Sequence, residues 1–150
     1  MIRRRARSEE GFTLIELMVV VLIIGILIAI ALPTFIGARE RAADRAMQTD
    51  VRTALASALV WYSDARSYTG FDVPSALATE PNIHWMAPGP PQYGQVDIEV
   101  ANGDLLLLIG QSQGGTYFCV SQLAGSPLTD KGKGKNFADV DTIPECTGGW

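Results

Sequence analysis

The strongest pattern in the chain is an unbroken apolar run near its start. Residues 12–32 read FTLIELMVVVLIIGILIAIAL, and Glu16 is the only charged residue among them. A helix of this length extends about 30 Å, roughly the thickness of the hydrocarbon core of a bilayer. Because the run is apolar on every side, it predicts a helix surrounded by lipid or by other copies of itself, rather than a helix on the surface of a small domain.

A second pattern predicts an amphipathic helix over residues 39–65. Apolar side chains recur there at spacings of three and four, which places them on one helix face; they are Ala43, Met47, Val51, Ala54, Leu55, Ala58 and Tyr62. Pro33 lies where the apolar run ends. Since proline removes a helical hydrogen bond, it predicts a kinked but continuing helix, and a simple exit from the membrane is the alternative.

Beyond the helix the pattern changes to that of β-strands. Alternating or β-branched stretches predict strands over 82–86, 95–101, 104–109 and 116–123. The Asn102-Gly103 pair predicts a hairpin turn, and a short helix is expected near 74–80. We therefore expect an α+β fold, in which a long N-terminal helix packs on an antiparallel sheet of three or four strands. Residues 124–150 lack periodicity and predict a C-terminal loop.

Charge is distributed unevenly along the chain. The net charge is −4 overall, with +2 on residues 1–11 and −6 on the remainder. An acidic body without a basic stripe argues against binding to nucleic acid. Lys131, Lys133 and Lys135 are separated by glycines and predict a solvated loop, with a contact patch for anions as the second interpretation.

The basic residues before the apolar run predict its orientation. Arginines on the N-terminal side of a span remain in the cytoplasm, so the C-terminal domain should lie outside. In that oxidising compartment the two cysteines, Cys119 and Cys146, are expected to form a disulfide.

Two ordinary interpretations of the apolar run are a secretory signal peptide, cleaved near Ala29-Ile30-Ala31, and a plain signal anchor. A signal peptide does not account for residues 8–11, which separate the arginines from the apolar run. A plain anchor does not account for a carboxylate inside the span, because a charge there costs free energy. A third interpretation is a cut between Gly11 and Phe12. The new amine of Phe12 would then lie on the same helix face as Glu16, and the two charges would neutralise each other within one chain or between neighbouring chains.

The sequence Gly11-Phe12-Thr13-Leu14-Ile15-Glu16-Leu17, followed by the apolar run and Pro33, resembles the prepilin N-terminal motif of the type IV pilin-like family. The resemblance covers about residues 1–60. It implies that a prepilin peptidase cuts after Gly11 and N-methylates Phe12, and that Glu16 meets the Phe12 amine of an adjacent subunit during assembly. The pair Glu9-Glu10 before the junction departs from the most familiar leader.

The resemblance further implies a leader over 1–11, an assembly helix over 12–32, its continuation over 33–65 and a globular head over 66–150. The implied function is that of a structural subunit of a surface filament. Its partners would be copies of itself in a helical filament, prepilin peptidase, and an assembly platform with its ATPase. The chain would reside in the cytoplasmic membrane before assembly and in an extracellular pilus afterwards. A pseudopilin of type II secretion or DNA uptake is the alternative, and a membrane-anchored binding domain is the rival outside the family.

We expect no enzymatic activity and no cofactor, because no catalytic constellation is visible. The only histidine, His84, precedes Trp85 and is interpreted as a packed aromatic neighbour. Asp139 and Asp141 are candidate calcium ligands, since Ca²⁺ binds carboxylate oxygens. A solvated acidic loop is the preferred interpretation of these two residues.

Overall fold

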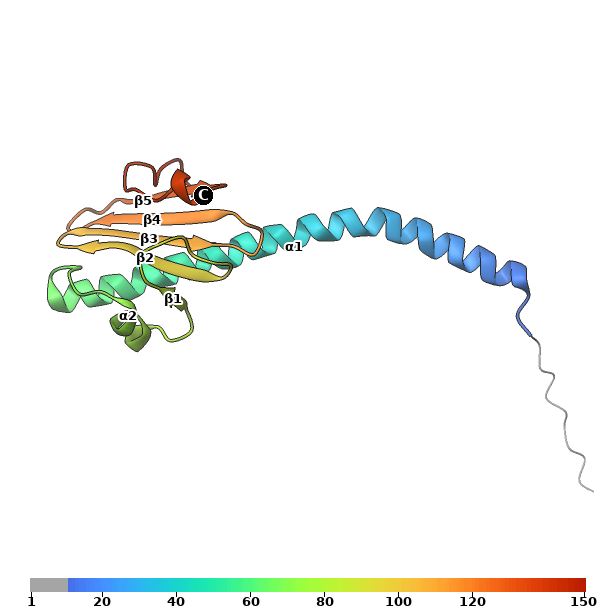
Figure 1. The fold of residues 1–150 in the computed structure, drawn as a ribbon, viewed down its shortest axis with the longest axis horizontal. Helices are drawn as coiled ribbons and strands as arrows, with labels where there is room; N and C mark the ends of the chain where they lie inside the picture. Colours follow the sequence, from blue (N-terminus) through green and yellow to red (C-terminus); the bar gives the residue numbers. More distant parts are fainter. Residues whose placement is uncertain (1–10) are drawn as a thin grey trace, which may run out of the picture. The chain divides into compact units, whose positions relative to one another are not determined.

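The computed structural model describes residues 11–150, so the predicted leader over residues 1–10 lies outside the described part of the chain. The chain divides into two compact units after Ala38, and each is described by itself. The elements (Figure 1) are α1 (Leu14–Ala65), α2 (Val73–Thr79), β1 (His84–Met86), β2 (Gln95–Asn102), β3 (Leu105–Gln111), β4 (Tyr117–Leu123), β5 (Thr129–Gly134) and the 3-10 helix η1 (Phe137–Asp139).

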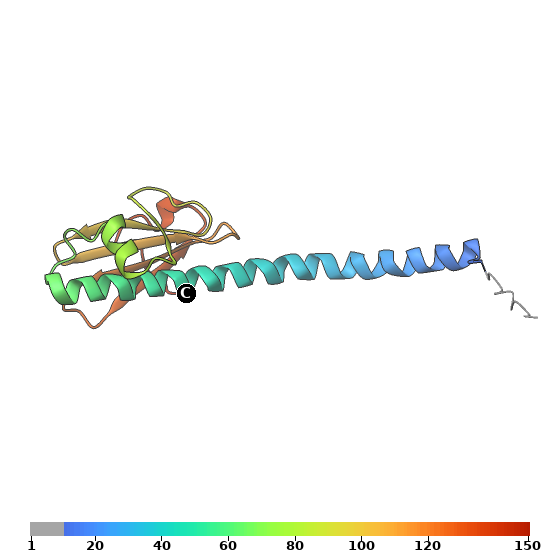
Figure 2. The same cartoon turned by 90° about the horizontal axis from the view of Figure 1, so that it is seen from below.

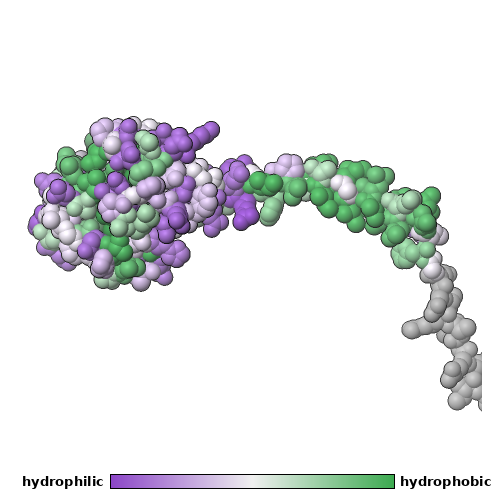
Figure 3. All heavy atoms as spheres, in the orientation of Figure 1, coloured by the Kyte–Doolittle hydropathy of each residue, from purple (hydrophilic) through white to green (hydrophobic). Residues whose placement is uncertain are grey.

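The apolar run forms the first part of α1, which continues through Pro33 without a break in helical structure. Within residues 14–36 the large apolar side chains are between 47% and 72% exposed. Figure 3 shows this stretch as a continuous hydrophobic surface. Among residues 11–150, α1 is the one helix that is long and apolar enough to cross a membrane. The kink at Pro33 stays a prediction.

The remainder of α1 packs against the sheet through the predicted apolar face (Figure 2). Met47, Val51, Ala54 and Ala58 are at most 2% exposed, and the other predicted members of this face are half-buried. They share one hydrophobic core with side chains from β3 and β4, among them Leu106, Leu108, Phe118 and Val120. The amphipathic helix is therefore confirmed, and so is the short helix near residue 74, which is α2.

The sheet has the strand order β1-β2-β3-β4-β5. The strands from β2 to β5 form an antiparallel meander, whereas β1 pairs with β2 in parallel. The predicted α+β fold, a long helix packed on an antiparallel sheet, is confirmed. The strand count is slightly off, because the sheet has five strands instead of three or four, and β1 is the one strand that pairs in parallel. The missed strand β5 reads TDKGKG, which carries no alternating apolar residues, and β1 is only three residues long. Strand β5 is defined by its hydrogen bonds to β4, whereas β1 also contributes the buried Trp85 to the core.

A second, smaller core covers the opposite face of the sheet. Leu107 and Ile109 of β3 lie there with Val140 and with the disulfide between Cys119 and Cys146. The Cα atoms of the two cysteines are 5.7 Å apart, so the predicted disulfide is formed and fixes the C-terminal loop to β4. The structure thus has a helix on one face of the sheet and a disulfide-bonded loop on the other.

Candidate assembly site

The start of α1 is closed by reciprocal hydrogen bonds between Thr13 and Glu16. The backbone N–H of Thr13 donates to Glu16 Oε2 over 2.9 Å, and the Thr13 hydroxyl donates to the same oxygen over 2.6 Å. In return, the Glu16 N–H donates to Thr13 Oγ1 over 3.3 Å. This arrangement is a capping box, in which a threonine and the acidic residue three positions later satisfy N–H groups that the first helical turn leaves free.

Glu16 therefore caps the start of α1, a role that was not predicted from the sequence. A Thr-x-x-Glu spacing before an apolar run is a known helix-start signal, so the sequence contained the evidence for it. The box also fixes the carboxylate at the first turn of the helix, beside Phe12. The structure therefore places Gly11, Phe12 and Glu16 together, whereas the pairing of Glu16 with a Phe12 amine stays a prediction.

The predicted cleavage junction is accessible. Gly11 and Phe12 precede the helix, and Phe12 is 85% exposed. Within residues 11–150, a Cβ atom added at Gly11 would meet nothing within 4 Å. No described residue therefore covers this side of the junction, and glycine adds no side chain of its own.

The candidate calcium ligands have other partners in the structure. Asp139 Oδ2 accepts hydrogen bonds from the backbone N–H groups of Lys135 (3.0 Å) and Asn136 (2.9 Å), which closes the turn into η1. Loss of hydration raises the pKa of the Asp141 carboxyl, and the neighbouring Glu145 carboxylate raises it further. Within residues 11–150 no group of three or more His, Cys, Asp or Glu side chains is arranged to hold a metal ion.

Two other sequence interpretations are corrected. His84 is exposed on β1, and it is its neighbour Trp85 that is buried in the core, so the interpretation of His84 as a packed residue is wrong. The lysines Lys131 and Lys133 belong to strand β5 instead of a loop. Their ammonium groups extend on long apolar stems, which is compatible with a strand whose other residues are small.

Asp97 in β2 carries a buried carboxyl group that was not predicted from the sequence. Asp97 is 0% exposed, and neither of its carboxyl oxygens has a hydrogen-bond partner among residues 11–150. Burial raises the pKa of Asp97 to about 8, and the nearby Glu99 carboxyl adds to the rise. The alternation of Val96, Ile98 and Val100 places Asp97 on the other side of the strand, but it gives no sign that this side is covered.

Comparison with known proteins agrees with this arrangement. Residues 6–32 match the family model described as the prokaryotic N-terminal methylation motif. The chain is 36% identical over 94 residues to the type II secretion system core protein G of Klebsiella michiganensis, a match that covers 61% of this chain and 66% of that protein.

Two pilus proteins are also similar to part of the chain. The identity is 43% over 63 residues with the type IV major pilin protein PilA of Myxococcus xanthus, covering 42% of this chain and 29% of that one. It is 40% over 63 residues with the type IV wide pilus major component PilA4 of Thermus thermophilus, covering 42% and 48%. The matches thus span less than two thirds of these relatives. No solved structure is significantly similar to the chain.

The chain thus carries the N-terminal methylation motif and an exposed apolar helix, and it is similar to type IV pilins and to a type II secretion core protein G.

Proposed function

We propose that this chain is a structural subunit of a type IV pilus-like surface filament. It is made as a precursor, cleaved after Gly11, N-methylated on Phe12 and polymerised through the helix of residues 12–32. One observation carries the proposal: a fully exposed apolar helix has a single carboxylate, Glu16, held at its first turn. The described chain offers this helix no protein surface of its own, so lipid or other copies must surround it.

The physical role of Glu16 follows from what surrounds the helix, which is lipid or other copies of the helix. An apolar helix gains little by leaving lipid for a helix bundle, because lipid tails are as apolar as leucine. A carboxylate differs, since an unpaired charge is costly in either setting and a partner of opposite sign removes much of that cost. The Phe12 amine created by cleavage supplies such a partner on a neighbouring copy, and it fixes the register in which copies associate.

The capping box supports this role. Thr13 holds the Glu16 carboxylate with two hydrogen bonds, to one of its two oxygens. The other oxygen has capacity to accept a further donor, because a carboxylate offers about four acceptor sites. Glu16 can therefore cap its own helix and bind a neighbour's amine at the same time.

The proposed partners follow from the life cycle of such a subunit. They are copies of the chain itself, a prepilin peptidase, an assembly platform and its ATPase. The proposed location is the cytoplasmic membrane, with the 39–150 unit outside, and afterwards the surface filament. The disulfide between Cys119 and Cys146 supports an oxidising environment for this unit.

A pseudopilin of a type II secretion system is the alternative function. It is favoured by the match to core protein G of Klebsiella michiganensis, which extends over 94 residues and thus beyond the N-terminal helix. A short periplasmic assembly, in place of long filaments on the cell surface, would support it. A pseudopilin of DNA uptake and a membrane-anchored binding domain are the remaining alternatives.

The test compares Glu16→Ala and Glu16→Gln with Glu40→Ala, which removes an exposed carboxylate outside the apolar run. Both Glu16 variants should be inserted and cleaved, but should yield about tenfold fewer filaments, as loss of a buried charge pair predicts. Glu40→Ala should assemble normally. Filaments in normal yield from Glu16→Ala would contradict the proposal.

A further inference from the structure

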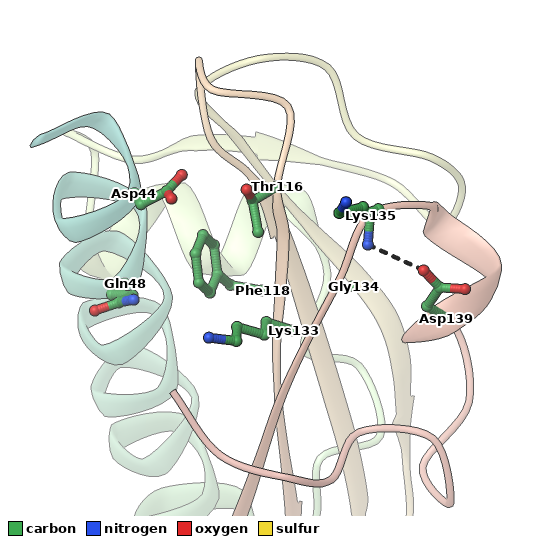
Figure 4. A pocket seen from close by; sticks show the side chains of 8 residues that line it. All are labelled: Asp44, Gln48, Thr116, Phe118, Lys133, Gly134, Lys135 and Asp139. Atoms are coloured by element: carbon green, nitrogen blue, oxygen red, sulfur yellow. Dashed lines mark hydrogen bonds between the residues drawn. The ribbon is translucent and has the colours of Figure 1, made fainter. Parts of the chain in front are cut away.

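A groove of about 560 Å³ lies between the helix and the edge of the sheet within the 39–150 unit. Asp44 and Gln48 of α1 form one wall, and Lys133 and Lys135, at the end of β5, form the other (Figure 4). The ring of Phe118 lies between these walls. The groove therefore combines an aromatic floor with basic side chains.

The three lysines of the chain are concentrated beside this groove. Lys131 and Lys133 pair across the sheet with Val120 and Phe118, whose side chains belong to the core under α1. Both lysines therefore lie on the helix side of the sheet, because paired residues on neighbouring strands share a face. The Lys131 ammonium lies 5.4 Å from the centre of the Trp150 ring, and the Arg52 guanidinium lies 4.7 Å from it. Basic groups thus lie on the helix side of the sheet along both α1 and β5.

The carboxylates of the groove already have other hydrogen-bond donors. Asp44 Oδ1 accepts from the Ser112 hydroxyl over 2.6 Å, and Asp139 Oδ2 accepts from the backbone N–H of Lys135 over 3.0 Å. These donors are neutral, so Asp44 and Asp139 keep their negative charges. Within residues 11–150, however, neither carboxylate forms an ion pair with Lys133 or Lys135, and the ammonium groups remain able to pair with carboxylates of a partner.

The 39–150 unit also carries a crowded acidic cluster, formed by Glu99 of β2 with Asp141 and Glu145 of the C-terminal loop. Loss of hydration raises the pKa of Asp141, and the charges of Glu145 and Glu99 raise it further. Glu145 accepts from the Thr142 hydroxyl over 2.6 Å, and Glu99 accepts from the Gly89 N–H over 3.1 Å. Carboxylates that repel one another in this way are stabilised when a cation from outside the cluster lies beside them.

The two surfaces cannot meet within one chain. Residue Glu99 lies in β2 and the lysines in β5, three strands apart in the sheet, a separation of about 14 Å at the usual strand spacing. Asp139 lines the groove, but the loop beyond it packs on the opposite face of the sheet, where Val140 and Cys146 lie with Cys119 and Ile109. A second copy of the chain is able to bring the two together.

We propose that the groove between α1 and β5 receives the acidic C-terminal loop of a second copy, with Lys133 and Lys135 facing Asp141 and Glu145. This inference rests on the proposed function, because it describes a contact between filament subunits. Two different surfaces meet in this contact, the groove of one copy and the acidic loop of the other. The first copy then still has a free loop and the second a free groove. Such a heterologous contact repeats without closing and produces an open filament. Complementary charge sets its register and rejects wrong pairings.

Charge reversal in the full-length chain tests the pairing. Lys133→Glu/Lys135→Glu and, separately, Asp141→Lys/Glu145→Lys should each lower filament yield about tenfold or more, because like charges then face each other. The chain with all four substitutions should regain most of the yield. Asp104→Lys, which reverses an exposed carboxylate elsewhere, is the matched control and should assemble normally. An intact Cys119–Cys146 disulfide in each variant shows that its domain folds.

A zero-length carbodiimide cross-link identifies the contact directly. Filaments assembled from a mixture of ¹⁴N and ¹⁵N chains should give mixed-isotope peptides that join Lys133 or Lys135 to Asp141 or Glu145. Cross-links found only within one isotope, or no rescue by the fourfold variant, would overturn the inference. So would charge-reversal variants that assemble normally and lose only binding to DNA or to anionic vesicles. If the wild-type chain forms no filaments at all, it is the proposed function that fails.

Discussion

Gly110 of β3 lies directly beneath Met47 of α1. A Cβ atom at this position would overlap the Met47 sulfur and would approach Val51 Cγ2 to 2.8 Å. Met47 is 2% exposed and Val51 is 0% exposed, and both side chains belong to the core between α1 and the sheet. The close approach of α1 to the sheet thus depends on the absence of a side chain at Gly110.

We therefore predict that Gly110→Ala destabilises the protein by about 1–3 kcal/mol, the usual cost of overpacking a core. Chemical denaturation of the detergent-solubilised chain measures this loss. Adding Met47→Ala should cost less in the Gly110→Ala background than in wild type, because it removes the overlapping sulfur. Strictly additive losses would show that the two residues do not collide.

The disulfide is predicted to stabilise the 39–150 unit. Cys119 and Cys146 are 27 residues apart in sequence, and closing a loop of this size contributes about 3.6 kcal/mol in the chain-entropy description. Replacing both cysteines with serine should lower the free energy of unfolding by roughly this amount. Denaturation curves of the wild-type chain with and without reductant provide the comparison; coincident curves would refute the prediction.

Asp97 predicts an unusual dependence of stability on pH. Its pKa is raised to about 8 in the folded chain, against about 3.9 for an unfolded aspartate. Between these values the folded state keeps a proton that the unfolded state releases. The contribution of Asp97 to the free energy of unfolding is therefore complete below about pH 4 and is lost as pH rises towards 8.

The substitution Asp97→Asn should remove this dependence and raise the melting temperature at pH 8 by about 5 °C, since it replaces a buried acid with a neutral group. Melting temperatures of wild type and variant between pH 5 and pH 9 provide the test. Asp104→Asn, at an exposed position, is the control and should follow wild type. Parallel pH profiles for wild type and Asp97→Asn would contradict the prediction.

Thr13 is predicted to act as a positioning residue for Glu16. Thr13→Val keeps the shape of the side chain but removes the hydroxyl that donates to Glu16 over 2.6 Å. Filament yield should fall less than for Glu16→Ala, because the carboxylate itself remains. Thr13→Ser keeps the hydroxyl and should behave as wild type. Equal yields from Thr13→Val and Thr13→Ser would show that the hydroxyl does not matter.

The elements that the sequence predicted correctly have a strong hydrophobic period or a specific turn. The face of α1 that contains Met47 and Val51 follows the helical repeat. The predicted hairpin is present, although its two-residue turn is Gly103-Asp104, one residue beyond the expected Asn102-Gly103. Strand β5 was missed because it contributes lysines and glycines, which carry no strand pattern. Its place depends on backbone pairing with β4, and long-range pairing of this kind has no local signal.

The residues of the candidate site likewise divide into those that were predicted from the sequence and those that were not. Gly11, Phe12 and Glu16 were recognisable because they are consecutive or one turn apart. The burial of Asp97 was not, because the alternation along β2 does not show that both faces of the sheet are covered. The facing of Lys133 toward Gln48 likewise depends on packing between α1 and β5.

The decisive measurement is the mass of the N-terminal peptide of the protein recovered from sheared cell-surface material. We expect a peptide that begins with N-methylated Phe12, which would establish cleavage after Gly11 together with export. A peptide that begins at Leu32, after the Ala29-Ile30-Ala31 sequence, or at Met1 would contradict it. The chain would then carry an ordinary signal peptide or anchor, and the role assigned to Glu16 in assembly would be wrong.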